Sequence, residues 1–416
     1  MKLRSAALSG LVGLVAGSLG AVAAPAQAAT IVNPVFASSF TCPATVCGLD
    51  PSTVISLSGN ADAMGAATRA ANQLSSLFSN NVTANILVYG IHDGTNGFLA
   101  ASLSSQTVYS YNQYTAALTA DAAANPHNTV LNTAVANLPL GNGGADPNGT
   151  LMAVNTTDAR ALGLTNGVNT AFGVGNATPQ FNATGNFVGG GGFADGVIVL
   201  NLDQPLLYNR PMPAFDSSVG PLYDAQTSLE HEMDEIMGIG GAGSQLNNAN
   251  FDPNYAQDFY GVNGPLIGPM DLYRYQAPGL PSFDPFVPSI TGCNNPAFCS
   301  GLPSPYFSVD GGLTFIDSFN QAFPVFGGDA ADWGLNLFKL CPGGLGIGGT
   351  GDVQDAFSCN NHSADVHFGT PSYLAYEAIG YNSANAPEPA VWGLMITGFG
   401  LAGFALRRRR LAYAIA

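Results

Sequence analysis

The sequence predicts an α+β fold, because helix-like and strand-like segments follow one another along its first half. Apolar residues recur at helical spacing over residues 61–78, and the apolar, β-branched run over 82–91 is typical of a buried strand. A second strand is expected over 195–202, followed by a helix over 223–237 that ends at Gly238. This order of helix, strand, strand and helix favours a sheet with helices packed against it.

Two shorter helices are expected between these strands, over residues 111–124 and 157–164. After the last helix the chain becomes rich in Pro, Gly, Asn and Asp, and it has no further long periodic segment. We therefore expect an ordered part over 29–243, which includes the helix over 223–238, and an irregular part over 244–386.

The N-terminus has the pattern of a secretory signal peptide. Lys2 and Arg4 precede an apolar run that ends in the small-residue pattern Ala26-Gln27-Ala28. Residues 1–28 are therefore expected to direct export through the Sec pathway and to be removed, so that the mature chain begins at Ala29.

The C-terminus carries three features in order over residues 387–410. Pro387-Glu388-Pro389 precedes an apolar stretch over 390–406, which is long enough for a short transmembrane helix, and four arginines follow it. This order resembles the PEP-CTERM sorting signal of Gram-negative bacteria, which an exosortase recognises and removes. The resemblance implies an exosortase-type partner, transient contact with the inner membrane, and a final place in the periplasm, on the outer surface or in the medium. A plain C-terminal membrane anchor is the alternative.

The six cysteines fall in three locally spaced pairs, which in an exported chain favour disulfides that close small loops. Local pairing would join Cys42 with Cys47, Cys293 with Cys299, and Cys341 with Cys359. Two of these disulfides would staple the irregular C-terminal part. A zinc–thiolate site is disfavoured, because no two cysteines have the two-residue spacing of a zinc knuckle.

The charge of the chain is strongly acidic, with a formal net charge of −16. Between Ala29 and Ala386 there are 26 acidic residues and five basic ones. Five scattered basic side chains cannot form the patch that nucleic-acid binding needs, so nucleic acid is excluded as a partner. An excess of carboxylates instead favours cations.

Three of the five glutamates of the chain surround one histidine, in Glu230-His231-Glu232 and Glu235. On a helix, positions i and i+4 share a face, so His231 and Glu235 would present an imidazole and a carboxylate side by side to a metal ion. Glu232 would then be the general base that accepts a proton from an activated water. Zn2+ is the expected ion, and Mn2+ or Fe2+ is the alternative because a carboxylate replaces a second histidine. The opposing interpretation is a solvated acidic helix face.

The helix motif His231-Glu232-Met233-Asp234-Glu235-Ile236-Met237-Gly238 resembles that of exported metalloproteases of PEP-CTERM bacteria, which carry His-Glu-x-x-Glu-x-x-Gly. The likeness extends over residues 269–279, 306–312, 328–329 with 332–333, 355–357 and 377–381. The resemblance implies a zincin-like fold for the ordered part and a metal-dependent activity on polypeptide substrates.

A third protein ligand is needed, because no histidine follows at Gly241. Asp271 is the first candidate, since Pro269-Met270-Asp271 is similar to the methionine turn beneath metzincin sites. A turn-capping role is its alternative. His362 and His367 are the next candidates.

Acidic side chains in glycine-rich turns could also gather around structural Ca2+. The candidates are Asp310, Asp329 with Asp332, and Asp352 with Asp355. Turn chemistry alone would also explain these residues. Tyr273 and Tyr275 could stabilise an oxyanion, although packing is the more common role for tyrosines in such a loop.

The function expected from these features is an exported metal-dependent peptidase. The strand over 195–202 could act as an edge that pairs with an extended substrate. The alternatives are a non-catalytic surface or biofilm-matrix protein on a zincin-like scaffold, and a metal-dependent hydrolase that acts on other bonds.

Overall fold

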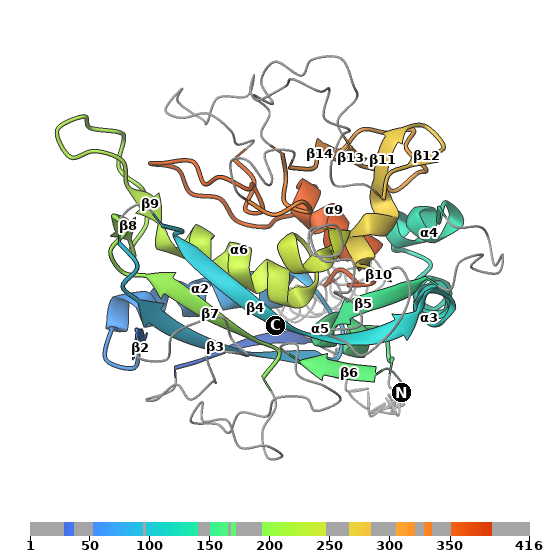
Figure 1. Cartoon of the computed structure of the whole chain (residues 1–416), viewed down its shortest axis with the longest axis horizontal. Coiled ribbons are helices and arrows are strands. Elements are labelled where there is room, and N and C mark those ends of the chain that lie inside the picture. Colours follow the sequence, from blue (N-terminus) through green and yellow to red (C-terminus); the bar gives the residue numbers. More distant parts are fainter. Residues whose placement is uncertain are drawn as a thin grey trace, which may run out of the picture.

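A mixed sheet with helices on its face organises the protein (Figure 1). The structure is a computed structural model that describes residues 29–36, 53–94, 97–139, 150–164, 168–171, 194–246, 266–283, 305–320, 328–334 and 351–384. The main sheet has eight strands in the order β1-β3-β7-β4-β5-β10, with β2 paired to β3 and β6 paired to β4. These strands are β1 (Thr30–Val35), β2 (Val54–Ser56), β3 (Val82–Ile91), β4 (Ala100–Ser110), β5 (Leu151–Asn155), β6 (Val168–Ala171), β7 (Gly196–Asn201) and β10 (Leu266–Ile267).

Strand direction changes within this sheet. β1, β3 and β7 run parallel to one another, whereas β4 runs antiparallel to β7 and to β5. The described helices are α2 (Ala61–Leu77), α3 (Tyr111–Ala124), α4 (Thr129–Ala136), α5 (Thr156–Ala161), α6 (Ala225–Met237) and α9 (Pro371–Ala378). The mixture of sheet and helix is consistent with the predicted α+β class.

Helices α2 and α6 and strand β3 form the centre of the fold. α2 begins after Asn60, whose side chain accepts a hydrogen bond from the backbone of Ala63, and its buried face is mostly alanine. Small side chains let α2 pack closely against β1 and α6, while α6 packs against β4 and β7. In β3, Ile86 and Val88 belong to the core beneath these helices, and alternate residues belong to a second cluster on the opposite face. Both helices therefore cover the same face of the sheet.

The part of the chain beyond residue 243 contributes short elements to the same core. β11 (Arg274–Ala277), β12 (Leu280–Pro281), β13 (Tyr306–Phe307) and β14 (Asp317–Ser318) form a small antiparallel sheet. Earlier in the chain, β8 (Leu206–Leu207) pairs with β9 (Tyr223–Asp224), and two 3-10 helices, η1 (Gly241–Gly243) and η2 (Pro269–Tyr273), follow α6. Phe307, Trp333 and Tyr376 share the hydrophobic core with α2 and α6, and β10 extends the main sheet. The C-terminal part thus lies on the ordered part without a separate core among the described residues.

The position of β7 corrects one expectation. The strand predicted over 195–202 was expected at an edge, but β7 is hydrogen-bonded to β3 on one side and to β4 on the other. The segment Ala100–Ser104 of β4 pairs with β7, whereas pairing with β5 begins only at Gln106. On its side away from β7, this segment has no strand partner within the described ranges.

Several expectations fall on residues outside the described ranges. These are the signal peptide, the sorting signal with its helix over 390–406, and five of the six cysteines. Cys359 is described and takes part in a disulfide bond. Its partner cysteine lies outside the described ranges, so the three local pairings remain predictions. Among the described residues, no helix combines the length and the apolar character needed to cross a membrane.

Candidate metal centre

Helix α6 carries the histidine and glutamates that the sequence singled out. The helix begins after Asp224, whose side chain accepts a hydrogen bond from the backbone of Gln226, and it ends at Gly238 in the left-handed conformation with φ 114°. The left-handed residue turns the chain back over the helix, so that the N–H of Gly241 donates a hydrogen bond to Glu235 Oε1 at 3.2 Å. A Cβ at Gly241 would lie 2.3 Å from Asp329 Oδ2 and 2.4 Å from Glu235 Oε1. Any larger residue would force these two carboxylates to shift.

Three side chains converge at this place. His231 Nε2 lies 3.7 Å from Glu235 Oε1 and 4.0 Å from Asp332 Oδ2. One ligand atom from each of the three side chains lies within 4.8 Å of the other two. Ligands around tetrahedral zinc are about 3.3 Å apart, given bonds of about 2 Å, so a small contraction would let all three reach one ion.

The imidazole of His231 has a fixed orientation. Its Nδ1 donates a hydrogen bond to the carbonyl oxygen of Val353 at 3.0 Å. A hydrogen bond from one ring nitrogen to a backbone carbonyl directs the lone pair of the other nitrogen outwards, as in metal-binding histidines. When the ring is neutral, His231 Nε2 therefore presents its lone pair to the space between Glu235 and Asp332.

The carboxylates crowd one another, and their pKa values show it. Burial raises the pKa of Glu232 to about 7. The positive charge of His231 lowers this pKa, and Asp332 and Asp329 raise it further. Burial raises the pKa of Asp332 to about 6, although the positive charge of His231 lowers it. Burial, followed by repulsion from Glu232 and Asp329, holds the pKa of Glu235 well above its usual range. Burial lowers the pKa of His231, but Asp332 and Glu232 outweigh it and raise this pKa to about 9. A divalent cation would relieve this repulsion, so the residues fit a metal ion.

Asp271, the predicted third ligand, lies elsewhere. It is buried in η2, where Oδ1 accepts a hydrogen bond from Ser244 Oγ at 2.6 Å and Oδ2 accepts one from the N–H of Gly268 at 2.7 Å. A third donor, the N–H of Gln245, lies 3.2 Å from Oδ2. The carboxylate thus caps a turn, and we replace Asp271 by Asp332 as the third candidate ligand.

Asp332 could not be singled out from the sequence as a partner of His231. The sequence only grouped it with Asp329 as a candidate for calcium, because both lie in a glycine-rich turn. Two other calcium candidates act within their own turns: Asp310 accepts hydrogen bonds from Ser308 and Thr314, and Asp355 accepts them from the backbone of Gly351 and Asp352. Asp352 accepts hydrogen bonds from the N–H of Gln354 and from Ser372 Oγ. Within the described ranges, the group of His231, Glu235 and Asp332, called the metal group below, is the one set of three donor side chains close enough to share an ion.

The two tyrosines near η2 have packing roles. The hydroxyl of Tyr273 donates a hydrogen bond to the carbonyl oxygen of Ala378 at 2.7 Å, and that of Tyr275 donates one to Asn137 at 3.1 Å. Both phenols are therefore engaged with backbone carbonyls in the described structure, and neither is assigned to an oxyanion.

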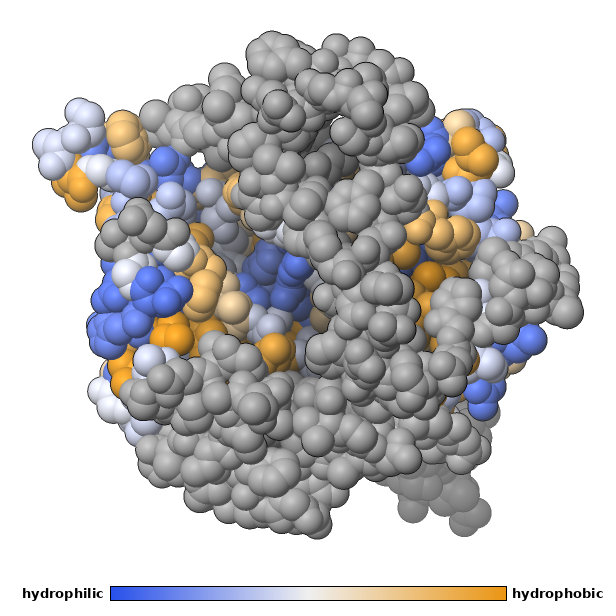
Figure 2. All heavy atoms as spheres, viewed as in Figure 1, coloured by the Kyte–Doolittle hydropathy of each residue, from blue (hydrophilic) through white to orange (hydrophobic). Residues whose placement is uncertain are grey.

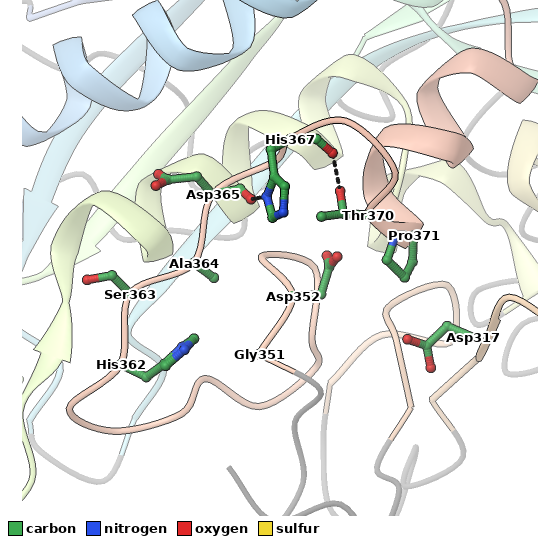
Figure 3. A pocket seen from close by; sticks show the side chains of 10 residues that line it. All are labelled: Asp317, Gly351, Asp352, His362, Ser363, Ala364, Asp365, His367, Thr370 and Pro371. Atoms are coloured by element: carbon green, nitrogen blue, oxygen red, sulfur yellow. Dashed lines mark hydrogen bonds between the residues drawn. The ribbon is translucent and has the colours of Figure 1, made fainter. Parts of the chain in front are cut away.

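His362 and His367 line a pocket of about 490 Å³ together with Asp317, Asp352 and Asp365 (Figure 3). Figure 3 shows Asp352, His367 and Thr370 at one end of this pocket and His362 at the other. Asp352 directly precedes Val353, the residue that holds His231, so one loop forms both a wall of the pocket and a support of the metal group. Neither histidine belongs to the group around His231.

The surface above α6 is hollowed. Figure 2 shows hydrophilic side chains gathered in a recess at the middle of one face, over the place where α6 lies in Figure 1.

Comparison with family models, curated proteins and solved structures gave no match to the chain.

Proposed function

We propose that the chain is an exported metal-dependent peptidase in which His231, Glu235 and Asp332 hold a divalent cation. The observation that supports this proposal best is the convergence of one imidazole and two carboxylates, drawn from α6 and a distant loop, within 4.8 Å. Such a donor set suits zinc, and its two carboxylates also suit Mn2+ or Fe2+. The cation, when bound, would supply the Lewis acidity that activates water and polarises a carbonyl group.

Glu232 is the proposed general base. It is 7% exposed, and its pKa of about 7 lies near neutral pH because burial and neighbouring carboxylates disfavour its charged form. A base with a pKa near the working pH can accept a proton from water and then return it to a leaving amine. The proton therefore stays on one side chain between the two steps.

The side of Ala100–Ser104 in β4 that has no strand partner among the described residues is the proposed place for an extended polypeptide. Ser102, in the middle of Ala100–Ser104, donates a hydrogen bond to Glu235 Oε2 at 2.5 Å. A substrate strand paired with this segment would run past the metal group, with its backbone held by main-chain hydrogen bonds. We further propose the zincin-like arrangement, with a sheet below its active-site helix, and export directed by the two terminal signals.

The first experiment measures metal content and cleavage of unfolded protein substrates by the purified chain, its Glu232→Gln variant and a Glu377→Gln control. Glu377 lies in α9 and bonds Tyr373 and Ser383, away from His231. We expect about one ion per wild-type chain. Glu232→Gln should retain the ion and lose cleavage by roughly 100-fold to 10,000-fold, the range for removal of a general base. Glu377→Gln should cleave as the wild type does.

Two results would contradict the peptidase. Full cleavage by Glu232→Gln would remove this residue from the base role. Firm binding of the ion by the wild type, with no cleavage of varied peptides, would favour the non-catalytic surface protein, and turnover of esters alone would favour a different hydrolase.

A further inference from the structure

A buried glutamine joins two of the three proposed metal ligands. Gln354 is fully buried, and its amide Nε2 lies 3.2 Å from His231 Nε2 and 3.0 Å from Asp332 Oδ1. When the His231 ring is neutral, the amide donates to its Nε2, the atom that would bind the cation, and it also donates to one carboxylate oxygen of Asp332.

The backbone of Gln354 is held in place by its neighbours. Its N–H donates a hydrogen bond to Asp352 Oδ1 at 3.1 Å, and its carbonyl oxygen accepts one from the N–H of Trp333 at 2.9 Å. Trp333 directly follows Asp332, and Val353, which holds His231, directly precedes Gln354. Two adjacent segments therefore fix Gln354 and the two ligands relative to one another.

The oxygen of the same amide is without a partner. Gln354 Oε1 is buried and accepts no hydrogen bond from the described residues. A buried carbonyl oxygen without a hydrogen bond costs free energy, which a bound cation would offset. Amide oxygens are ligands for divalent cations in proteins.

We infer that Gln354 is a fourth protein ligand, which binds the cation through Oε1. This inference rests on the proposed metal site. His231 Nε2 cannot give its lone pair to an ion and accept from the amide at once, so the carboxamide must turn. A half-turn about its last bond exchanges Oε1 with Nε2 and brings the oxygen to about 3 Å from His231 Nε2 and Asp332 Oδ1, near the spacing of ligands around one ion.

This inference changes the character of the site. One nitrogen and three oxygens make it harder than a site with two histidines, which raises its relative preference for Mn2+. Mn2+ takes up to about six ligands, so four protein donors still leave room for water and substrate.

The test measures Mn2+ and Zn2+ affinity by calorimetry on the full chain and on two variants. Gln354→Met keeps the length of the side chain and removes the amide. Gln245→Met is the matched control, because Gln245 is also buried with an unpartnered Oε1 but bonds Gln106 instead of His231. We expect Gln354→Met to weaken Mn2+ binding by about 10-fold to 100-fold. Gln245→Met should bind as the wild type does.

The outcomes separate this inference from the proposed function. A wild-type chain that binds neither ion would overturn the metal site itself. If the wild type binds and a folded Gln354→Met chain binds equally well or better, only the ligand role of Gln354 is overturned. Should this variant fail to fold, a crystal structure of the wild type loaded with Mn2+ decides: the inference requires Oε1 within about 2.3 Å of the ion.

Discussion

The hydroxyl of Tyr376 donates a hydrogen bond to Asp234 Oδ1 over 2.7 Å inside the core, and both side chains are fully buried. This bond ties α9 to the helix that carries the metal group. The second oxygen of Asp234 has no hydrogen-bond partner among the described residues, so Tyr376 is the donor on which this carboxyl group depends.

Tyr376→Phe should therefore destabilise the protein. It removes one hydroxyl without changing the ring, and it leaves a buried acceptor without a donor, which costs about 1–3 kcal/mol. Urea unfolding measures the effect. Tyr223→Phe is the control, because the hydroxyl of Tyr223 makes no hydrogen bond within the described part of the chain, and its variant should stay within about 0.5 kcal/mol of the wild type. Equal losses in the two variants would show that the bond to Asp234 contributes nothing.

The two candidate third ligands can be compared directly through their asparagine variants. Asp332→Asn removes a charged ligand and should lower Zn2+ affinity at least 10-fold, measured by competition with a chelator. Asp271→Asn should leave that affinity unchanged and lower the free energy of unfolding, because Asp271 accepts three hydrogen bonds in a buried turn. The reverse pattern would restore Asp271 as the ligand.

The buried carboxyl of Asp158 should make stability depend on pH. Burial raises its pKa well above the usual range, and the hydroxyl of Tyr114, 3.4 Å away, offsets only part of this effect. The folded chain therefore keeps a proton that the unfolded chain releases above pH about 4. The contribution of Asp158 to stability is complete below that pH and is lost as the pH rises towards the folded pKa, by about 1.4 kcal/mol per pH unit.

Asp158→Asn should remove this loss. The free energy of unfolding of the variant should therefore increase relative to that of the wild type as the pH rises from 4 to 7. Urea unfolding at several pH values measures the difference. Asp203→Asn is the control, because the hydrogen bond from His92 lowers the pKa of Asp203 and its effect has the opposite sign. Parallel curves for wild type and Asp158→Asn would refute the prediction.

The elements with strong local signals could be predicted closely. Residues 82–91 and 111–124 are β3 and α3 with the predicted bounds, and α6 ends at Gly238 as expected. Each of these signals lies within one segment: apolar periodicity, a capping side chain, or a glycine that adopts a positive φ. The pairing of β7 was predicted wrongly, because a buried central strand and a buried edge strand have the same apolar pattern.

By itself, the sequence determined that His231 and Glu235 share one face of a helix, since four residues make about one turn. It also determined the strongly acidic balance of the chain, because composition does not depend on folding. Only the tertiary structure decided which aspartate joins His231. Asp271 and Asp332 both lie in turns, and their roles differ because the loops that carry them pack differently on α6. The same packing decided that Gln354 faces the metal group. Contacts between segments far apart in the chain cannot be read from the local sequence of either segment.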